Sequence, residues 1–376
     1  MTRILFVFGT RPEAIKMAPL ILAAKASPDF TPIVVVTGQH RAILDEVLGT
    51  FGIAPDHDLN LIKARQTLTH ITTSVLEGLE PILLQEQPAA VIVQGDTTTT
   101  FAAGLAAFYQ RIPVVHVEAG LRSGDMLSPY PEEVNRKLAT QVASLHLAPT
   151  ARAAQALRDE QVDPSRIVIT GNSVIDALQQ VIALGATITS DIEHFIGDHP
   201  LLLVTSHRRE SWEAGLANVA AAIARIATEF PDLRVVFPIH PNPVVREQMA
   251  PALGEASNVL LVDPQPYPQF SALLHRAHIV LTDSGGVQEE APALGKPVLV
   301  TRENTERPEA VESGAARLIG TDTDAVADAL RTLLTRPTEY ALMATAISPY
   351  GDGRASERTI QALRYLLNDA PKPVDF

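Results

Sequence analysis

Short, continuously apolar runs recur along the chain and alternate with longer stretches in which apolar and polar residues mix at helical spacing. The runs form two series, first Ile4–Phe8, Ile33–Thr37, Val91–Gln94, Val114–Val117 and Ile167–Thr170, and later Leu201–Thr205, Val235–Pro238, Val259–Val262, Ile279–Thr282 and Val298–Val300. Strands that are apolar on both faces are typical of parallel sheets that helices cover on both sides. The pattern therefore predicts an α/β fold with parallel sheets.

The two series predict two α/β halves that are joined near residues 170–200. The stretches between the runs are Ala-rich and amphipathic, as expected of covering helices, and three clear examples are Phe101–Tyr109, Leu216–Ala227 and Asp324–Leu334. At 376 residues the chain is long enough for two ordinary domains. The tail from Ala370 contains two prolines, and we expect it to be frayed.

Composition limits the function more than the fold. The net charge of −13 argues against a nucleic-acid partner, although a few local basic residues can still hold a small anion. The absence of cysteine excludes disulfides, thiol catalysis and Cys-ligated zinc. No apolar run reaches membrane-spanning length, and the first run is too short for a signal peptide. We therefore expect a cytoplasmic protein with no membrane partner.

The most informative segment is DSGGVQEEAPALGKPVLV, which starts where an apolar run ends. Ser284, Gly285 and Gly286 lie between a predicted strand and a predicted helix, so bare N–H groups and the positive end of a helix dipole meet there. This arrangement suits a phosphate, and Glu290, one turn into the helix, can reach ribose hydroxyls. The alternative is a tight strand-to-helix turn that binds nothing.

The first run is followed by GTRPEAIK, which places Arg11 and Lys16 at a helix start. These cations can contact phosphate, and the alternative is that they are solvated first-turn charges. The segment lacks the GxGxxG spacing of a dinucleotide site, so we expect no nicotinamide cofactor.

Carboxylates follow the next runs of the first half. Asp96 stands where a run breaks, and its alternative role is a helix N-cap. Glu118 emerges at the end of another run with no evident structural task, which favours a ligand-binding or catalytic role. Glu132, Glu133 and Arg136 open the next predicted helix, where they could instead be ordinary first-turn acids and an i, i+4 ion pair.

Basic side chains follow two runs of the second half. His207, Arg208 and Arg209 come after one run, and His240 comes after the next. Because ligands in open parallel sheets bind beyond the carboxyl ends of the strands, these groups together indicate an anion site. The alternative for each of them taken alone is a plain surface residue.

The motifs, taken in order, resemble one family. The segments FGTRPEAIKMAPL, QGDTTTT, HVEAGLRSGD, PEEVNRKLA, GNSVIDAL, HRRESW, DSGGVQEEAPALGKPVLV and ERPEAV are similar to those of the bacterial non-hydrolysing UDP-N-acetylglucosamine 2-epimerases. The resemblance implies two Rossmann-like domains around a central cleft, as in the GT-B glycosyltransferases. It also implies domain limits of 1–170 and 171–352, with a C-terminal helix at about 353–370 that completes the first domain.

The resemblance also implies roles for residues. It implies catalysis by Asp96, Glu118, Glu132 and His207. It implies substrate and UDP binding by Arg11, Lys16, Arg136, Phe270, Ser284, Gly285, Gly286, Glu290 and Arg307, with Phe270 against uracil. Ser206, next to His207, departs from the Gly or Ala common in relatives, but it is also small, so we expect the same chemistry.

Many members of this family are activated by a second UDP-N-acetylglucosamine, and we expect this chain to form a homodimer. The matching positions for such an effector are Gln39, His40, Arg65, Arg208 and His240. All five are polar or basic, which suits a second diphosphate, and the alternative is that they are ordinary loop residues. Ala42 replaces a polar residue of some relatives, so we expect one effector contact fewer.

The implied reaction is reversible epimerisation at C2, with neither NAD nor metal, which supplies N-acetylmannosamine-type sugars for cell-surface polysaccharide. The C2 proton has no adjacent carbonyl to acidify it, so elimination of UDP to 2-acetamidoglucal and re-addition is the expected route. The alternatives are an epimerase for a 2,3-diacetamido uronic acid, a GT-B glycosyltransferase, and a UDP-sugar sensor without turnover.

Overall fold

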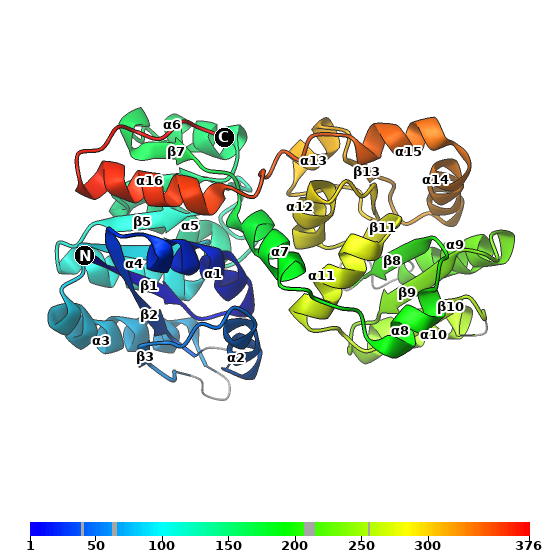
Figure 1. The fold of residues 1–376 in the computed structure, drawn as a ribbon, viewed down its shortest axis with the longest axis horizontal. Coiled ribbons are helices and arrows are strands. Elements are labelled where there is room, and N and C mark those ends of the chain that lie inside the picture. The colour runs from blue at the N-terminus through cyan, green and yellow to red at the C-terminus, as the bar shows by residue number, and fades with distance from the viewer. Residues whose placement is uncertain (39–40, 62–65, 207–214, 255) are drawn as a thin grey trace. The chain divides into compact units, whose positions relative to one another are not determined.

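The computed structural model describes residues 1–38, 41–61, 66–206, 215–254 and 256–376. Contacts divide the chain into two compact units (Figure 1). Unit 1 comprises Met1–Gln180 and Tyr350–Phe376, and unit 2 comprises Val181–Pro349. In the described part of the chain, no helix is both long and apolar enough to cross a membrane.

Unit 1 is built on a seven-stranded parallel sheet in the order β3-β2-β1-β4-β5-β6-β7. Its strands are β1 (Thr2–Phe8), β2 (Phe30–Val36), β3 (His57–Asp58), β4 (Ala90–Gln94), β5 (Val114–Val117), β6 (Leu145–Ala148) and β7 (Ile167–Ile169). Its helices are α1 (Arg11–Ala26), α2 (Arg41–Thr50), α3 (Leu68–Glu86), α4 (Thr98–Tyr109), α5 (Glu132–Val142), α6 (Ala151–Asp159), α7 (Ser173–Ala183), which runs into unit 2, and α16 (Ala355–Leu367).

Unit 2 has a six-stranded parallel sheet in the order β10-β9-β8-β11-β12-β13. Its strands are β8 (Leu201–Thr205), β9 (Arg234–Pro238), β10 (Val259–Val262), β11 (Ile279–Thr282), β12 (Val298–Val300) and β13 (Ala316–Leu318). Its helices are α8 (Ser190–Ile196), α9 (Gly215–Glu229), α10 (Pro243–Leu253), α11 (Tyr267–Arg276), α12 (Gly285–Ala293), α13 (Pro308–Glu312), α14 (Thr323–Thr335) and α15 (Pro337–Ala344). Two parallel-sheet α/β domains are confirmed.

The central strands explain why continuous apolar runs form these sheets. In β1, Phe6 pairs in register with Val34 of β2 and Ile92 of β4, and all three side chains are buried. Helices cover the sheet in two contacting groups, α2, α1 and α16 in one and α3, α4 and α5 in the other. A strand covered on both faces has no position for a polar side chain, so its sequence reads as an unbroken apolar run.

Unit 1 is completed by residues that follow unit 2 in the sequence. Helix α16 packs on α1 (Figure 1), and the buried Asp176 of α7 accepts hydrogen bonds from the N–H groups of Ala355 and Ser356 at 3.1 and 2.8 Å. The expectation of a frayed tail is wrong, because the N–H of Phe376 donates to the carbonyl oxygen of Ile169 at 2.8 Å. Asp375 in turn accepts from the N–H of Ile169 at 2.8 Å, so the tail is bound along β7.

Each sheet contains one point where the strand order reverses. In unit 1 the reversal lies between β1 and β4, and in unit 2 it lies between β8 and β11. The connections after these strands diverge to opposite faces of the sheet and leave a crevice at its carboxyl edge, which is where ligands bind in such folds. The carboxyl ends of β1, β4, β8 and β11, and of their neighbours, therefore hold the candidate site residues.

Candidate active site

Glu118 is the most strongly held of the candidate residues in unit 1. It follows β5, is 9% exposed, and its backbone has a left-handed φ of 61°. Lys16 of α1 forms an ion pair with its Oε2, and the side-chain amides of Gln94 and Asn172 donate to the same oxygen at 3.1 and 3.2 Å. A buried carboxylate is stable only with such partners. A left-handed backbone at a non-glycine residue is uncommon and costs conformational energy, and strained residues of this kind cluster at functional sites.

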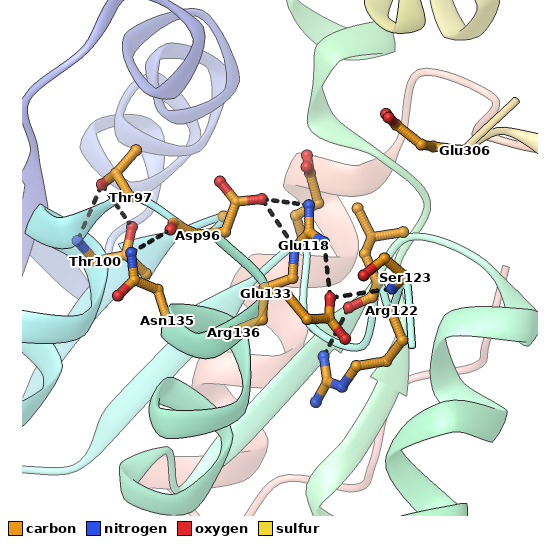
Figure 2. A network of polar contacts seen from close by, with 12 residues as sticks. Asp96, Thr97, Thr100, Glu118, Arg122, Ser123, Glu133, Asn135, Arg136 and Glu306 are labelled. Atoms are coloured by element: carbon orange, nitrogen blue, oxygen red, sulfur yellow. Dashed lines mark hydrogen bonds and ion pairs between the residues drawn. The ribbon is translucent and has the colours of Figure 1, made fainter. Parts of the chain in front are cut away.

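Asp96 and Arg136 form a second charged pair. The Nε and Nη2 atoms of Arg136 lie 2.9 and 2.6 Å from Oδ2 of Asp96 (Figure 2). Asn135 donates to the backbone carbonyl of Asp96 at 2.9 Å, which fixes the loop as well as the side chain. The N-cap of α4 is Thr97, whose side chain accepts from the N–H of Thr100, so the alternative of Asp96 as an N-cap is wrong.

Glu133 is fully buried and anchors Arg136 from its other side. Its carboxylate lies 3.1 Å from Nη1 of Arg136 and accepts from the N–H groups of Ser123 and Gly124 at 3.0 and 3.3 Å (Figure 2). Burial alone raises the pKa of Glu133, but these hydrogen bonds outweigh it and the pKa is lowered. Arg136 therefore pairs with Asp96 and Glu133, and not with Glu132 as the i, i+4 alternative has it. Glu132 is half-buried, and its side chain makes no hydrogen bond to another residue within the described ranges.

His116 lies on β5 beneath this loop. It is fully buried, and its Nε2 lies 2.7 Å from the carbonyl oxygen of Gly95, the residue before Asp96. Burial is the main cause that lowers the pKa of His116 to about 4, with the hydrogen bond to Gly95 acting against it. The imidazole is therefore neutral at pH 7, and the contact with a carbonyl requires the proton on Nε2.

The turn after Glu118 requires glycine at one position, which gives a testable prediction. Gly120 has φ +93°, and a Cβ there would lie 2.2 Å from the carbonyl oxygen of Ala153. Gly124 has φ +84° but has nothing within 4 Å of a Cβ, so it is a matched control. The left-handed backbone alone costs about 1–2 kcal/mol in either alanine variant. We expect Gly120→Ala to lose clearly more stability in denaturant unfolding, and to lower turnover, because the segment that carries Glu118 must move. Equal losses in the two variants would contradict this reading.

In unit 2, the segment after β11 forms the predicted strand-to-helix turn. Ser284 is the N-cap residue of α12, and a Cβ at Gly286 would meet only Oε2 of Glu290, at 3.9 Å, so the space beside this turn is open. The buried Asp283 accepts from the hydroxyl of Ser206 at 3.1 Å. Glu290 is 7% exposed and accepts from the hydroxyl of Tyr267 at 3.0 Å. The turn thus presents helix N–H groups with one oriented carboxylate nearby, which suits a phosphate and a diol.

Arg307 contacts a different carboxylate from the ribose candidate. It forms an ion pair with the buried Glu289, and its N–H donates to the hydroxyl of Thr305 at 3.0 Å. Thr305 donates to Gln288 at 2.7 Å, and Gln288 donates to the carbonyl of Ser284 at 3.1 Å. The Arg307 segment is therefore tied to the turn before α12 through α12 itself.

Five predicted residues lie outside the described residues, namely Gln39, His40, Arg65, His207 and Arg208. Of the predicted effector residues only His240 is described, half-buried, with its Nδ1 accepting from the N–H of Asn242 at 3.2 Å. The effector site and the homodimer stay predictions. Arg11 is exposed at the first position of α1, and Phe270 is half-buried in α11.

The known proteins to which this chain is similar belong to one enzyme family. The family model for UDP-N-acetylglucosamine 2-epimerase matches residues 22–364. The UDP-N-acetylglucosamine 2-epimerase of Escherichia coli K12 is 52% identical over 369 residues, which cover 96% of this chain and 98% of that protein. The chain belongs to the UDP-N-acetylglucosamine 2-epimerase family.

Solved structures of the same family agree in fold. A crystal structure of a UDP-N-acetylglucosamine 2-epimerase matches with a TM-score of 0.91 and 45% identity, and covers 100% of both chains. The Neisseria meningitidis enzyme matches with a TM-score of 0.86 and 43% identity, over 97% of this chain and 100% of that one. The resemblance inferred from the motifs is confirmed, and the chain is an isomerase of this family.

Sequence reasoning on this epimerase missed the residues that hold the candidates in place. Gln94 and Asn172 bind Glu118, while Tyr267 binds Glu290. None of these three has a local sequence signal, because each meets its partner only in the folded chain. Glu13 is different, since Thr10 followed by Glu13 fits the capping-box pattern at the start of a helix.

Proposed function

We propose that the chain interconverts UDP-N-acetylglucosamine and UDP-N-acetylmannosamine by elimination and re-addition of UDP. The observation that carries this is near full-length identity of about one half to UDP-N-acetylglucosamine 2-epimerases, combined with the charged pairs at the carboxyl edge of the unit 1 sheet. The resemblance names the residues, and these contacts show how the chain holds them.

In the forward direction the bond from C1 to the β-phosphate oxygen breaks, and its electron pair leaves with UDP. The C2 proton passes to a protein group and a double bond forms between C1 and C2, which gives 2-acetamidoglucal. A proton is then delivered to the opposite face of C2, and UDP adds back to C1. Two groups near C2 and a cationic environment for the departing diphosphate are needed.

Unit 2 supplies the nucleotide site in this proposal. The N–H groups at the start of α12 hold the diphosphate, and Glu290 accepts from the ribose hydroxyls. Phe270 packs on uracil, and Arg307 adds positive charge beside this turn. The crystal structure of the Neisseria meningitidis relative was solved with UDP-N-acetylglucosamine bound, and a Staphylococcus aureus relative, 44% identical, was solved with UDP.

Unit 1 supplies the groups that act on the sugar. Asp96, Glu118 and Glu132 are the carboxylates for proton transfer, together with His207 of unit 2. Lys16 and Arg136 keep Glu118 and Asp96 charge-compensated. A carboxylate held by several donors keeps a fixed direction, and a fixed direction is what proton transfer at one carbon requires.

The reaction is tested by incubating the enzyme with UDP-N-acetylglucosamine in deuterated water and examining C2 by NMR. We expect deuterium at C2 of both epimers, because the proton that is removed exchanges with solvent before another is delivered. Activity should survive EDTA and need no added NAD. Epimerisation with the original C2 hydrogen fully retained would contradict the elimination route, and product formed only with an acceptor sugar would indicate a glycosyltransferase.

A further inference from the structure

Glu13 of α1 belongs to the GTRPEAIK segment but is not among the predicted site residues. Its side chain is 2% exposed, and both of its oxygens are used. Oε2 accepts from the N–H groups of Gly9 and Thr10 at 3.0 and 2.7 Å. Oε1 accepts from the hydroxyl of Thr97 at 2.7 Å, and it shares the single hydrogen of the Thr100 hydroxyl, 3.2 Å away, with the carbonyl oxygen of Gln94. Three donors therefore serve this buried carboxylate alone, and a fourth is shared.

The two oxygens contact two different segments. Oε2 binds the turn between β1 and α1, directly before the first two turns of α1, which carry Arg11 and Lys16. Oε1 binds the start of α4, directly after Asp96. Because β1 and β4 are the neighbouring strands at which the order reverses in unit 1, the carboxylate joins the two sides of that crevice.

The contacts continue to the other charged pair. Thr100, which donates to Glu13, lies 2.6 Å from the carbonyl oxygen of Gln94. The side chain of Gln94 donates to Glu118. Glu13 is thus connected through buried hydrogen bonds to the segments that hold Lys16, Asp96 and Glu118.

A capping box alone does not account for this arrangement. In that motif the N3 carboxylate binds the N-cap N–H, and such boxes work well at exposed helix ends. Here the second oxygen binds residues 84 and 87 positions away in the sequence. Burying a charged carboxylate costs several kcal/mol, which only well-placed donors offset. Burial is also the main influence on the pKa of Glu13, which is raised despite these hydrogen bonds.

We propose that Glu13 is a positioning residue for the epimerisation, and that its buried carboxylate sets the start of α1, with Arg11 and Lys16, against the segment that follows Asp96. The inference rests on the proposed function, because it assigns these segments to one reaction. It deepens that function by naming a residue that acts on the reaction only through others.

The test compares Glu13→Gln with Glu13→Ala. In Glu13→Gln the amide oxygen can accept from Gly9 and Thr10, and the amide nitrogen can donate to the two hydroxyl oxygens, since a hydroxyl accepts as well as donates. In Glu13→Ala the N–H groups of Gly9 and Thr10 and the hydroxyl of Thr97 lose their acceptor, whereas Thr100 keeps the carbonyl oxygen of Gln94. Turnover is measured per UDP-binding site counted by calorimetry, so that loss of folded protein does not count as loss of catalysis.

We expect Glu13→Ala to lower turnover per site by about 10- to 100-fold, the scale of a small misplacement of reacting groups. The Kd for UDP should change by a smaller factor, because most of the proposed nucleotide site belongs to unit 2. Glu13→Gln should stay within about twofold of the parent, as a neutral substitution does. Glu13→Ala with parental turnover per site would overturn the inference. Equal losses in both variants would overturn it too, because the negative charge of Glu13, and not its hydrogen bonds to the two segments, would then matter. An inactive parent would instead overturn the proposed function.

A second pair of variants keeps the test valid if Glu13→Ala does not fold. Thr97→Val removes an N-cap hydroxyl of α4 together with its bond to Glu13. Thr67→Val removes the N-cap hydroxyl of α3, which accepts from the N–H of His70 at 3.1 Å in the same unit. Both lose about 1 kcal/mol of capping energy. Only Thr97→Val should lower turnover per site. Equal turnover in the two variants would overturn the inference, because the bond from Thr97 to Glu13 would then have no effect on the reaction.

Discussion

Replacing Glu118 by glutamine is expected to lower turnover by about 100-fold or more, the scale of a lost acid–base group. Glutamine has nearly the same shape and keeps an oxygen that can accept from Gln94 and Asn172, so the segment should stay in place. It removes the negative charge, the proton-accepting site and the ion pair with Lys16. The measurement is steady-state epimerisation of UDP-N-acetylglucosamine together with the Kd for UDP, which should change little.

Glu86→Gln is a suitable control for this prediction. Glu86 is a part-buried carboxylate of the same unit, bound to His57 at 2.9 Å. It lies at the end of α3, before β4 begins, and so away from the carboxyl ends of the strands. It should keep parental turnover. Asp96→Asn and Glu132→Gln complete the series and are expected to lose activity on the same scale. Near-normal turnover in both Glu118→Gln and Glu132→Gln would show that the catalytic assignment is wrong.

Replacing Glu290 by glutamine is expected to weaken UDP binding by about 10- to 100-fold, because a hydrogen bond to a charged group contributes about 1.5–3 kcal/mol. The carboxylate can accept from two ribose hydroxyls at once, whereas the amide offers one acceptor and one donor. Titration calorimetry with UDP measures the effect directly. Turnover at saturating substrate should fall less than the affinity does.

Two further variants give this result its meaning. Tyr267→Phe removes the hydroxyl that orients Glu290 and should weaken UDP binding in the same direction by a smaller factor. Glu229→Gln changes an exposed carboxylate of the same unit, at the end of α9, and should leave the Kd unchanged. If Glu290→Gln binds UDP as tightly as Glu229→Gln does, Glu290 is not a ligand of the ribose.

The sheets were largely predictable because their strands are buried on both faces. The runs Val114–Val117, Val259–Val262, Ile279–Thr282 and Val298–Val300 coincide with β5, β10, β11 and β12. The missed strands have physical reasons. β3 has only two residues, β6 contains the buried polar His146, and β13 has Arg317 at its centre, where the edge of the sheet exposes it. Continuous apolar runs therefore detect strands of apolar residues, including the edge strand β10, and miss strands that are very short or contain a polar side chain.

The site was predictable only in part. Asp96 and Glu118 stand out because the end of a buried strand is a costly place for an idle carboxylate. Their pairings could not be predicted, since Asn172 reaches Glu118 across 54 positions and Arg136 reaches Asp96 across 40. Such pairings depend on strand order, which no local pattern contains. The domain limits expected at residues 170 and 352 stay predictions.

The return of the chain to unit 1 has a consequence for synthesis on the ribosome. Residues 350–376 follow the whole of unit 2, yet they supply α16 and the strand-like tail along β7. At 5–20 residues per second, unit 2 takes about 10–30 s to translate, and during that time the nascent unit 1 lacks its last helix. The apolar surface of α1 that α16 covers is then open to water, and Asp176 lacks the donors at 355 and 356. Unit 1 is therefore synthesised first but completes its fold last, and a chaperone that binds the nascent chain would meet unit 1 without α16.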